Sequence, residues 1–376
     1  MLRVDEFYSA IVESDISFFT GVPDSLLKDF CAYITDHTKP ESHIIAANEG
    51  NAVGLAAGHF LATGNPALVY MQNSGLGNAV NPLTSLVDPD VYSIPLLLVI
   101  GWRGEPGIKD EPQHVKQGKI TIPLLQAMDI QHCILPDDQK LAVKCLNEAV
   151  HVMRAEARPF ALVVRKGTFE PYRLKKKTSG NYEMSREDAI KIIASHLKSD
   201  DVVVSTTGKA SRELFEYRVA TGQQDTGQDF LTVGSMGHAS QIAMGIAFAK
   251  PKRNVYCLDG DGSLIMHMGA LAIIGSQHLV NFKHLIINNE AHDSVGGQPT
   301  VGNQIDIPAI AKACGYKQAW QAETGDELLE RLELLQLAEG PVLLEIRVNK
   351  GARTDLGRPT STPIENKMSF MRFLGE

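Results

Sequence analysis

Basic residues are scarce in this chain relative to acidic ones. Its 376 residues include 36 lysines and arginines against 44 aspartates and glutamates, so the formal net charge is -8. Proteins that bind nucleic acids obtain much of their affinity from an excess of Lys and Arg near the phosphate backbone. The composition therefore argues against nucleic acid as a partner, and an anionic ligand requires a local basic cluster.

The chain also lacks closely paired cysteines, a signal-like N-terminus and long apolar runs. Its five cysteines are scattered singly without a CxxC spacing, and acidic residues occur throughout the first stretch, MLRVDEFYSAIVESDISFF. Both features are typical of a cytoplasmic protein in a reducing compartment. No apolar run approaches the roughly 18 to 20 residues that span a bilayer, so we expect no membrane partner.

What the sequence does contain is an alternation of short apolar runs with segments of helical period. The runs include HIIAA, ALVYMQ and PLLLVIG in the first half and DVVVSTTG, NVYCLDGDG and FKHLIINN in the second. Such alternation predicts an α/β protein with two doubly wound parallel sheets, each covered by helices on both faces. A polar, basic stretch interrupts the pattern after Lys166, so we expect domains at 1–170 and 186–376, joined by a linker at 171–185 and without a middle domain.

Polar residues follow two strands of the second half. In NVYCLDGDGSL, Gly260 and Gly262 flank Asp261 directly after a strand, and Asn289 ends the strand FKHLIINN. Because ligands bind beyond the carboxyl ends of parallel strands, Asp261 and Asn289 should lie at the same edge. The glycines permit a tight turn whose backbone N–H groups face an anion at a helix N-terminus. Carboxylate and amide oxygens suit Mg²⁺, so the pattern predicts a magnesium-bridged diphosphate site.

Three other interpretations of this stretch are an EF-hand loop, a phosphate-binding P-loop and a plain structural turn. An EF-hand loop starting at Asp259 needs Gly at the position of Leu264 and Glu at that of Ala270, and it fails at both. The segment STTGKAS lacks the first Gly and the final hydroxyl of a phosphate-binding P-loop. A plain structural turn stays open for the DG dipeptide alone, although GDG followed after twenty-five residues by NN is far more specific.

This spacing resembles the cofactor-binding motif of the thiamin diphosphate-dependent enzyme superfamily. The resemblance implies that Asp261, Asn289 and the main-chain carbonyl of Ala291 ligate Mg²⁺. It also implies that Met236 lies beneath the bent cofactor, although the alternative is an ordinary core methionine. The further cofactor-binding residues that it implies are Thr207, Gly208, Gly234, Gly260, Gly262 and Ser263.

The same resemblance implies an acidic residue in the first half. Enzymes of this superfamily use a carboxyl group that hydrogen-bonds the aminopyrimidine ring and promotes deprotonation of the cofactor's reactive carbon. Glu49 follows the strand HIIAA and begins a helix rich in Gly and Ala, although a first-turn Glu also complements the helix dipole. The first domain would then bind the pyrimidine ring and the second the diphosphate. Because such active sites join domains of two subunits, a homodimer is the smallest expected working unit.

The short two-domain arrangement indicates which group of this superfamily the chain most resembles. With FFTGVPDSLLKDF near its start and NNEAHDSVGGQPT late, the chain most resembles the phosphonopyruvate decarboxylase family, followed by the sulfopyruvate decarboxylases. The implied reaction is decarboxylation of 3-phosphonopyruvate to phosphonoacetaldehyde and CO₂, on the route to a phosphonate such as 2-aminoethylphosphonate. A carboligating synthase is a more distant alternative, and a non-catalytic regulator on the same fold is the remotest.

A small anionic 2-oxo acid needs polar side chains at the strand ends of the first half. The loop GWRGEPGIKDEPQH offers Arg103, and a guanidinium suits a phosphonate or sulfonate. The candidates are Asp24, Ser25, Asn73, Arg103, Lys109 and His114, each of which has a surface, capping or turn role as its alternative. As proton donor after decarboxylation, His292 is preferred over Asp293. The sequence leaves open that donor, the choice between the two substrates, the end product of the pathway and any oligomer larger than a dimer.

Overall fold

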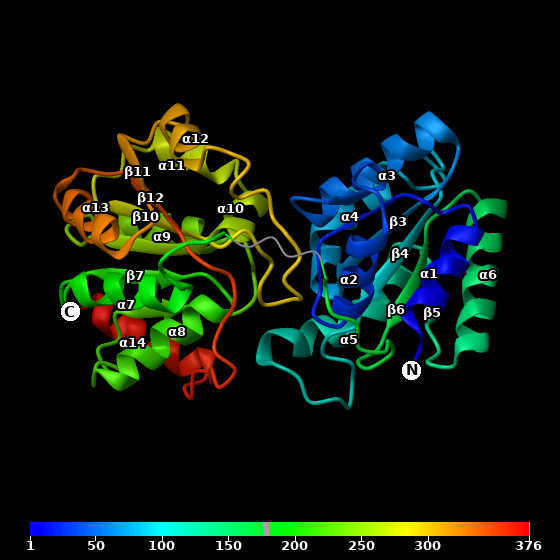
Figure 1. Ribbon diagram of the computed structural model, residues 1–376, viewed down its shortest axis with the longest axis horizontal. Coiled ribbons are helices and arrows are strands. Elements are labelled where there is room, and N and C mark those ends of the chain that lie inside the picture. The colour runs from blue at the N-terminus through cyan, green and yellow to red at the C-terminus, as the bar shows by residue number, and fades with distance from the viewer. Residues whose placement is uncertain (176–179, 376) are drawn as a thin grey trace. The chain divides into compact units, whose positions relative to one another are not determined.

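The computed structural model describes residues 1–175 and 180–375, which form two compact units. Residues 1–175 together with Val295–Gln298 make up the first unit, and the other described residues make up the second. Each unit contains a six-stranded parallel sheet with helices on both of its faces (Figure 1). The prediction of two doubly wound parallel sheets is confirmed, and no third domain lies between them within the described ranges.

The helices and strands of the first unit alternate along the chain. In order they are α1 (Val4–Glu13), β1 (Phe19–Gly21), α2 (Lys28–His37), β2 (His43–Ile45), α3 (Glu49–Thr63), β3 (Ala67–Gln72), α4 (Leu76–Ser85), β4 (Leu96–Gly101), α5 (Pro112–Ala127), β5 (Gln131–Ile134), α6 (Gln139–Ala155) and β6 (Phe160–Val164). Two short 3₁₀ helices, Pro40–Ser42 and Asn73–Gly75, complete the unit.

The second unit repeats this alternation. Its elements are α7 (Arg186–His196), β7 (Val202–Ser205), α8 (Lys209–Ala220), β8 (Asp229–Leu231), α9 (Ala239–Ala249), β9 (Val255–Gly260), α10 (Asp261–Met266), α11 (Ala270–Ser276), β10 (Phe282–Asn288), α12 (Ile307–Ala313), β11 (Gln318–Ala322), α13 (Gly325–Leu337), β12 (Val342–Arg347) and α14 (Pro363–Gly375).

The two sheets have the same strand order. The first runs β2-β1-β3-β4-β6-β5, and the second, read from its β8 edge, runs β8-β7-β9-β10-β12-β11. In each unit the second strand pairs with one side of the first strand, and the third strand pairs with its other side. Ligands of doubly wound folds bind outside the carboxyl ends of the strands at such a switch point. The strand ends of β1 and β3, and of β7 and β9, are therefore where site residues are expected.

Alternate side chains of each strand enter two separate cores. In β3, Leu68 and Tyr70 belong to the core on one face, while Ala67, Val69 and Met71 belong to the core on the other. The second sheet divides its side chains in the same way. Burial on both faces explains why these strands are continuous apolar runs, since each large apolar side chain removed from water contributes about 1.5–3 kcal/mol.

The crossover LIMHMGALAIIGSQ after β9 is not one continuous helix. The chain forms two short helices, because His267 leaves the helical conformation with φ -134° and ψ 46°. The second helix, α11, begins only at Ala270. The break leaves α10 as a short helix whose first residue is Asp261.

The predicted linker falls partly on residues 176–179, which lie outside the described residues. Before this gap, the backbone N–H of Tyr172 donates to Asp29 of the first unit at 3.0 Å. After it, the N–H of Tyr182 donates to Asn349 of the second unit at 3.1 Å. Each end of the predicted linker thus packs against its own unit. Among the described helices none has the length and hydropathy of a membrane span.

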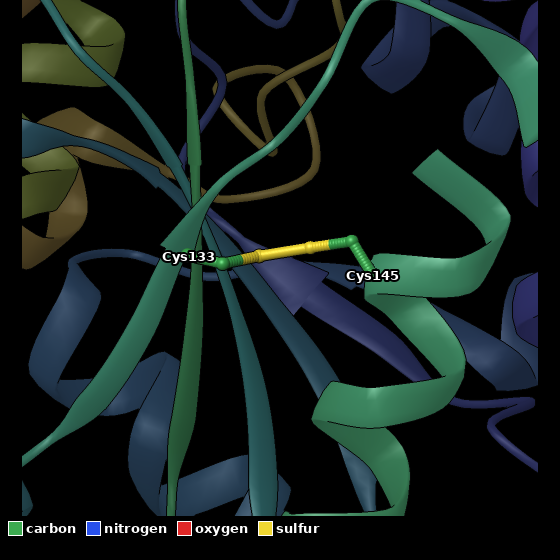
Figure 2. Close-up of a disulfide and its surroundings, with 2 residues drawn as sticks. All are labelled: Cys133 and Cys145. Carbon is green, nitrogen blue, oxygen red and sulfur yellow. A yellow bond between two sulfur atoms is a disulfide. The ribbon is translucent and has the colours of Figure 1, made fainter. Parts of the chain in front are cut away.

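A disulfide joins Cys133 of β5 to Cys145 of α6 (Figure 2). This pairing was not expected from the sequence, because the two residues are 12 positions apart and no CxxC spacing marks them. They meet because α6 folds back over the face of the sheet that contains β5, where both side chains pack against the same apolar core. The other cysteines, Cys31, Cys257 and Cys314, are free.

Candidate active site

Asp261 stands at the carboxyl end of β9 and begins α10. Gly260 before it has the extended backbone of an N-cap residue, and the helix starts immediately afterwards. The Asp261 side chain is only 2% exposed and accepts a hydrogen bond from the hydroxyl of Thr300. A Cβ atom on Gly302 would lie 3.0 Å from the Asp261 Oδ2 atom, so a glycine keeps the space beside the carboxylate clear.

The environment of Asp261 fits a metal ligand. Burial raises the pKa of this carboxyl to about 6, although hydrogen bonds from Thr300 and from the backbone N–H groups of Asn289 and Gly262 oppose the shift. A buried carboxyl with a raised pKa is one whose ionised form gains most from a neighbouring cation. The oxygen donors expected around it are those that Mg²⁺ prefers. The residues present are therefore compatible with the predicted magnesium site.

The two asparagines at the end of β10 differ in their contacts. The amide nitrogen of Asn288 donates to Glu345 at 2.7 Å and to Asn303 at 2.9 Å, so this side chain is committed to the packing of the unit. The Oδ1 atom of Asn289 accepts from the backbone N–H of Ala291 at 3.3 Å, which is its one hydrogen bond within the described residues. A carbonyl oxygen has two lone pairs, so Asn289 retains capacity for a further ligand.

The loop after β10 returns to the start of α10. Ala291 forms an antiparallel bridge with Pro299, and the N–H of Thr300 donates to the carbonyl of Glu290 at 2.9 Å. This return brings the Thr300 hydroxyl to Asp261. Strand register places Gly260 opposite Ile287, so the predicted ligands Asp261, Asn289 and Ala291 all follow the same edge of the sheet.

A second group of predicted residues is joined by hydrogen bonds at the same end of the sheet. The N–H of Gly234 donates to the Thr207 hydroxyl at 3.2 Å, and the N–H of Gly237 donates to the Ser263 hydroxyl at 3.1 Å. Gly208, the N-cap residue of α8, has φ 105°, a conformation that favours glycine. The turn around Gly234 is therefore fastened to the starts of both α8 and α10.

The side chains of Met236 and His292 both lie close to Gly262. A Cβ atom on Gly262 would lie 3.2 Å from the His292 ring and 3.5 Å from the Met236 methyl group, so the first turn of α10 has both side chains against its backbone. Burial lowers the pKa of His292 to about 4, which keeps the imidazole neutral near pH 7. A neutral imidazole can accept or donate a proton only through its own two nitrogens.

Asp293, the alternative to His292, is already paired. Its carboxylate accepts from Arg186 at 2.7 Å and lies 3.3 Å from the Lys209 ammonium. Burial opposes ionisation, but the hydrogen bond and charge of Arg186 and the charge of Lys209 lower the pKa of Asp293. The carboxylate thus serves as an ionised anchor for the loop, whereas the His292 ring lies beside Gly262.

Glu49 is the first residue of α3 and is 5% exposed. Asn48 caps the helix by accepting from the N–H of Asn51, which fixes the position of the first turn. The Glu49 carboxylate accepts a hydrogen bond from the Asn78 amide at 2.7 Å. A Cβ atom on Gly75 would lie 2.5 Å from the Glu49 carboxyl carbon, so the glycine gives this side chain its space. A buried, oriented carboxylate at this place is what the pyrimidine-binding role requires.

Asp24 and Ser25 lie after β1, and Ser25 contacts Arg103, which lies after β4. Asp24 Oδ2 accepts from the N–H groups of Leu26 at 3.0 Å and Leu27 at 3.3 Å. Burial raises the pKa of Asp24 to about 6, while these N–H groups and the charge of Arg103 oppose the shift. The Arg103 guanidinium donates to the Ser25 hydroxyl at 2.7 Å.

Of the remaining substrate candidates, Asn73 contacts the loop between β4 and α5, and Lys109 and His114 lie in or next to that loop. Asn73 donates to the carbonyl of Arg103 at 2.8 Å and to Thr121 at 2.9 Å, so it holds the loop rather than presenting a free amide. Lys109 is exposed, and His114 lies half-buried in the first turn of α5.

Sequence reasoning missed four residues of the candidate site: Thr300, Asn78, Gly75 and Asp110. Thr300 lies 39 positions from the Asp261 that it contacts, and Asn78 lies 29 positions from Glu49. Such contacts depend on how loops return to the sheet edge. Asp110 had a nearer signal, since it follows Arg103 by seven residues within one loop and pairs with it.

Comparison with known proteins gives consistent matches along the chain. The thiamine pyrophosphate enzyme N-terminal TPP binding domain matches residues 4–125, and the C-terminal TPP binding domain matches residues 206–346. Phosphonopyruvate decarboxylase of Streptomyces viridochromogenes is 33% identical, over 100% of this chain and 95% of that protein. Phosphonopyruvate decarboxylase of Streptomyces hygroscopicus is 32% identical, with the same coverage. Sulfopyruvate decarboxylase of Methanosarcina acetivorans is 28% identical, over 85% of this chain and 84% of that protein.

Fold, domain matches and full-length relatives agree. Both units have the sheet-and-helix architecture expected of thiamin-binding domains, and relatives above 30% identity extend over the whole chain. The chain belongs to the thiamine pyrophosphate (thiamin diphosphate) enzyme family, as a decarboxylase, and thus a carbon-carbon lyase, of the phosphonopyruvate decarboxylase group.

Proposed function

We propose that this protein decarboxylates 3-phosphonopyruvate to phosphonoacetaldehyde and CO₂, using thiamin diphosphate and Mg²⁺, in the biosynthesis of phosphonates of the 2-aminoethylphosphonate type. The observation that carries the proposal is the buried Asp261 at the start of α10, in a chain whose full length matches phosphonopyruvate decarboxylases. Sulfopyruvate is the second candidate substrate, because a sulfopyruvate decarboxylase is also similar over most of the chain.

Thiamin diphosphate, when bound, supplies a carbon nucleophile for the 2-oxo group and an electron sink for the breaking carbon-carbon bond. Asp261, Asn289 and the Ala291 carbonyl would hold Mg²⁺ and with it the diphosphate. Gly260, Gly262 and Ser263, at the start of α10, would contribute to the same site. Thr207, Gly208, Gly234 and Met236 would contact the cofactor from the neighbouring turns.

Glu49 would exchange a proton with the pyrimidine ring, with its carboxylate oriented by Asn78. His292, whose imidazole is neutral near pH 7, would relay a proton after CO₂ departs by giving one from one ring nitrogen and taking one up at the other. The pairing of Asp293 with Arg186 supports His292 over Asp293 in this role. Arg103 and Ser25 bind the distal anionic group, and Asp24 lies beside them. Asn73 supports the Arg103 loop. Lys109 and His114 stay as candidates for the rim of the substrate site.

We further propose that residues 1–170 form the pyrimidine-binding domain and 186–376 the diphosphate-binding domain, with 171–185 as linker, and that the working protein is at least a cytoplasmic homodimer. The face of α3 supports a dimer contact. Gly50, Gly54 and Gly58 line a groove of about 590 Å³, and a Cβ atom on Gly54 or Gly58 would meet nothing within 4 Å. Small residues in such a row allow a second helix to approach closely.

The decisive experiment is a coupled assay that compares phosphonopyruvate, sulfopyruvate and pyruvate with the purified holoenzyme. We expect the highest kcat/KM with phosphonopyruvate and its complete dependence on thiamin diphosphate and Mg²⁺. A higher kcat/KM with sulfopyruvate would replace the proposed substrate by the second candidate. Turnover of none of the three 2-oxo acids would refute the proposed function.

A further inference from the structure

The loop between β4 and α5 contains Asp110, whose carboxylate accepts four hydrogen bonds. It accepts from the Arg103 Nε atom at 2.8 Å and from Arg103 Nη2, so the pair is bidentate. It also accepts from the backbone N–H of Gly104 at 2.9 Å and of Glu111 at 2.7 Å. Although burial opposes ionisation, these donors hold the pKa of Asp110 well below its usual range. Asp110 is therefore an ionised, fixed partner of Arg103.

The pairing fixes which part of the Arg103 guanidinium is left for a ligand. Of its five N–H donors, the Nε donor and one on Nη2 bind Asp110, and one on Nη1 binds Ser25 at 2.7 Å. One N–H on each Nη atom has no acceptor among the described residues. The side chain is 18% exposed, so the remaining donors are within reach of a small solute. Two donors on adjacent nitrogens suit two oxygens of one anion.

The loop that presents this pair is itself fixed. The Trp102 indole donates to the carbonyl of Gly118 at 2.8 Å, and the N–H of Arg103 donates to Asn73 at 3.2 Å. Gly104 has φ 69°, and a Cβ atom there would overlap the carbonyl of His114, so the loop passes α5 in backbone contact. A receptor held in this way loses little conformational entropy when its ligand binds.

We propose that Asp110 is the positioning residue that makes Arg103 a receptor for the distal phosphonate or sulfonate of the substrate. This inference rests on the proposed function and deepens it, because it names the device that selects a doubly anionic 2-oxo acid over pyruvate. A site with fixed donors rejects an analogue that lacks the matching acceptors, and the methyl group of pyruvate has none.

Asp110→Asn preserves the size of the side chain and removes its charge and the bidentate acceptor. We expect the KM for phosphonopyruvate to rise about tenfold or more, with kcat changed less than about threefold, and kcat/KM for pyruvate unchanged. Arg103→Lys should produce the same loss, since Lys retains the charge and lacks the fork. The matched control is Glu105→Gln in the same loop, which breaks the pair of Glu105 with Arg165, 2.8 Å apart. It should leave the ratio of the two kcat/KM values unchanged.

A binding measurement separates this inference from the proposed reaction. Phosphonoacetate carries a carboxylate and a phosphonate but no 2-oxo group, so its calorimetric affinity does not depend on turnover. Wild-type holoenzyme and Glu105→Gln should bind it equally, and Asp110→Asn at least about tenfold more weakly. Equal affinity of wild type and Asp110→Asn, the same loss in Glu105→Gln, or no binding to wild type would overturn the inference. Asp110-dependent binding without decarboxylation of phosphonopyruvate would leave the inference standing and refute the proposed reaction alone.

Discussion

The Glu49 carboxylate occupies its position because two neighbours arrange it. Asn78 donates to it, and Gly75 lacks the Cβ atom that would otherwise overlap it. Neither neighbour belongs to the stretch of sequence that identifies Glu49. A carboxylate held by an oriented donor is prepared for proton transfer with little rearrangement. The proposed function of Glu49 should therefore be sensitive to small changes at Asn78 and Gly75.

Gly75→Ala tests that arrangement. Because the added Cβ atom would lie 2.5 Å from the Glu49 carboxyl carbon, we expect the side chain to be displaced and kcat to fall about 100-fold. Cofactor affinity measured by calorimetry should change by less than about fivefold, because the diphosphate site is untouched. Gly77→Ala is the matched control, since nothing lies within 4 Å of its Cβ position in α4. Wild-type kcat in Gly75→Ala would be inconsistent with the proposed place of Glu49.

The pH dependence of cofactor binding follows from Asp261. Its folded pKa of about 6 lies above the ordinary 3.8, so in the metal-free protein its protonation favours folding. That contribution is fully present below pH 3.8 and is lost as the pH rises through 6. Mg²⁺ requires the ionised form, so lowering the pH below about 6 opposes metal binding. At constant free Mg²⁺, we expect thiamin diphosphate affinity measured by calorimetry to be about tenfold weaker at pH 5 than at pH 7. A flat profile would exclude Asp261 as the titrating ligand.

At the scale of helices and strands, the sequence specifies much of the second sheet edge. The apolar runs of β9 and β10 and the polar residues after them predict which side chains share that edge, because parallel strands end together. The break between α10 and α11 was not predictable from periodicity, since His267 leaves the helix inside a stretch that is otherwise helical in pattern. The contact of Thr300 with Asp261 was equally hidden, because it requires the bridge between Ala291 and Pro299.

The disulfide between Cys133 of β5 and Cys145 of α6 predicts how many free thiols the protein has. Protein purified without reductant and then unfolded should titrate three free thiols, from Cys31, Cys257 and Cys314. After reduction all five cysteines should react. Cys145→Ser should give four thiols in both states, because it leaves Cys133 unpaired. Five thiols without reductant would contradict the disulfide, and would agree with the rarity of such bonds in a reducing cytoplasm.

At the scale of the whole molecule, two units with the same strand order present their candidate residues at the carboxyl ends of their strands. Glu49 and the Arg103 group belong to one unit, and Asp261 with Asn289 belongs to the other. Neither unit alone contains both the acid for the pyrimidine ring and the ligands for the diphosphate. The proposed homodimer accounts for this division, since one subunit would complete the site of another.

Substitution in the α3 groove tests the dimer. Gly58→Leu places an isobutyl group where a second helix would approach, so we expect dissociation at micromolar concentration and a parallel loss of activity. Sedimentation velocity of wild type and variant measures the first effect. Lys144→Leu is the control, because it adds the same apolar side chain on an exposed part of α6. A wild-type protein that sediments as a monomer while fully active would rule out the shared site.

The central claim is that this chain holds thiamin diphosphate through a magnesium ion bound by Asp261. Calorimetric titration of thiamin diphosphate into wild type and Asp261→Ala, each with and without Mg²⁺, tests it most directly. The account predicts binding to wild type only when Mg²⁺ is present, and at least about 100-fold weaker binding to Asp261→Ala under the same conditions. Equal affinity in the two proteins, or binding to wild type that is indifferent to Mg²⁺, would contradict it.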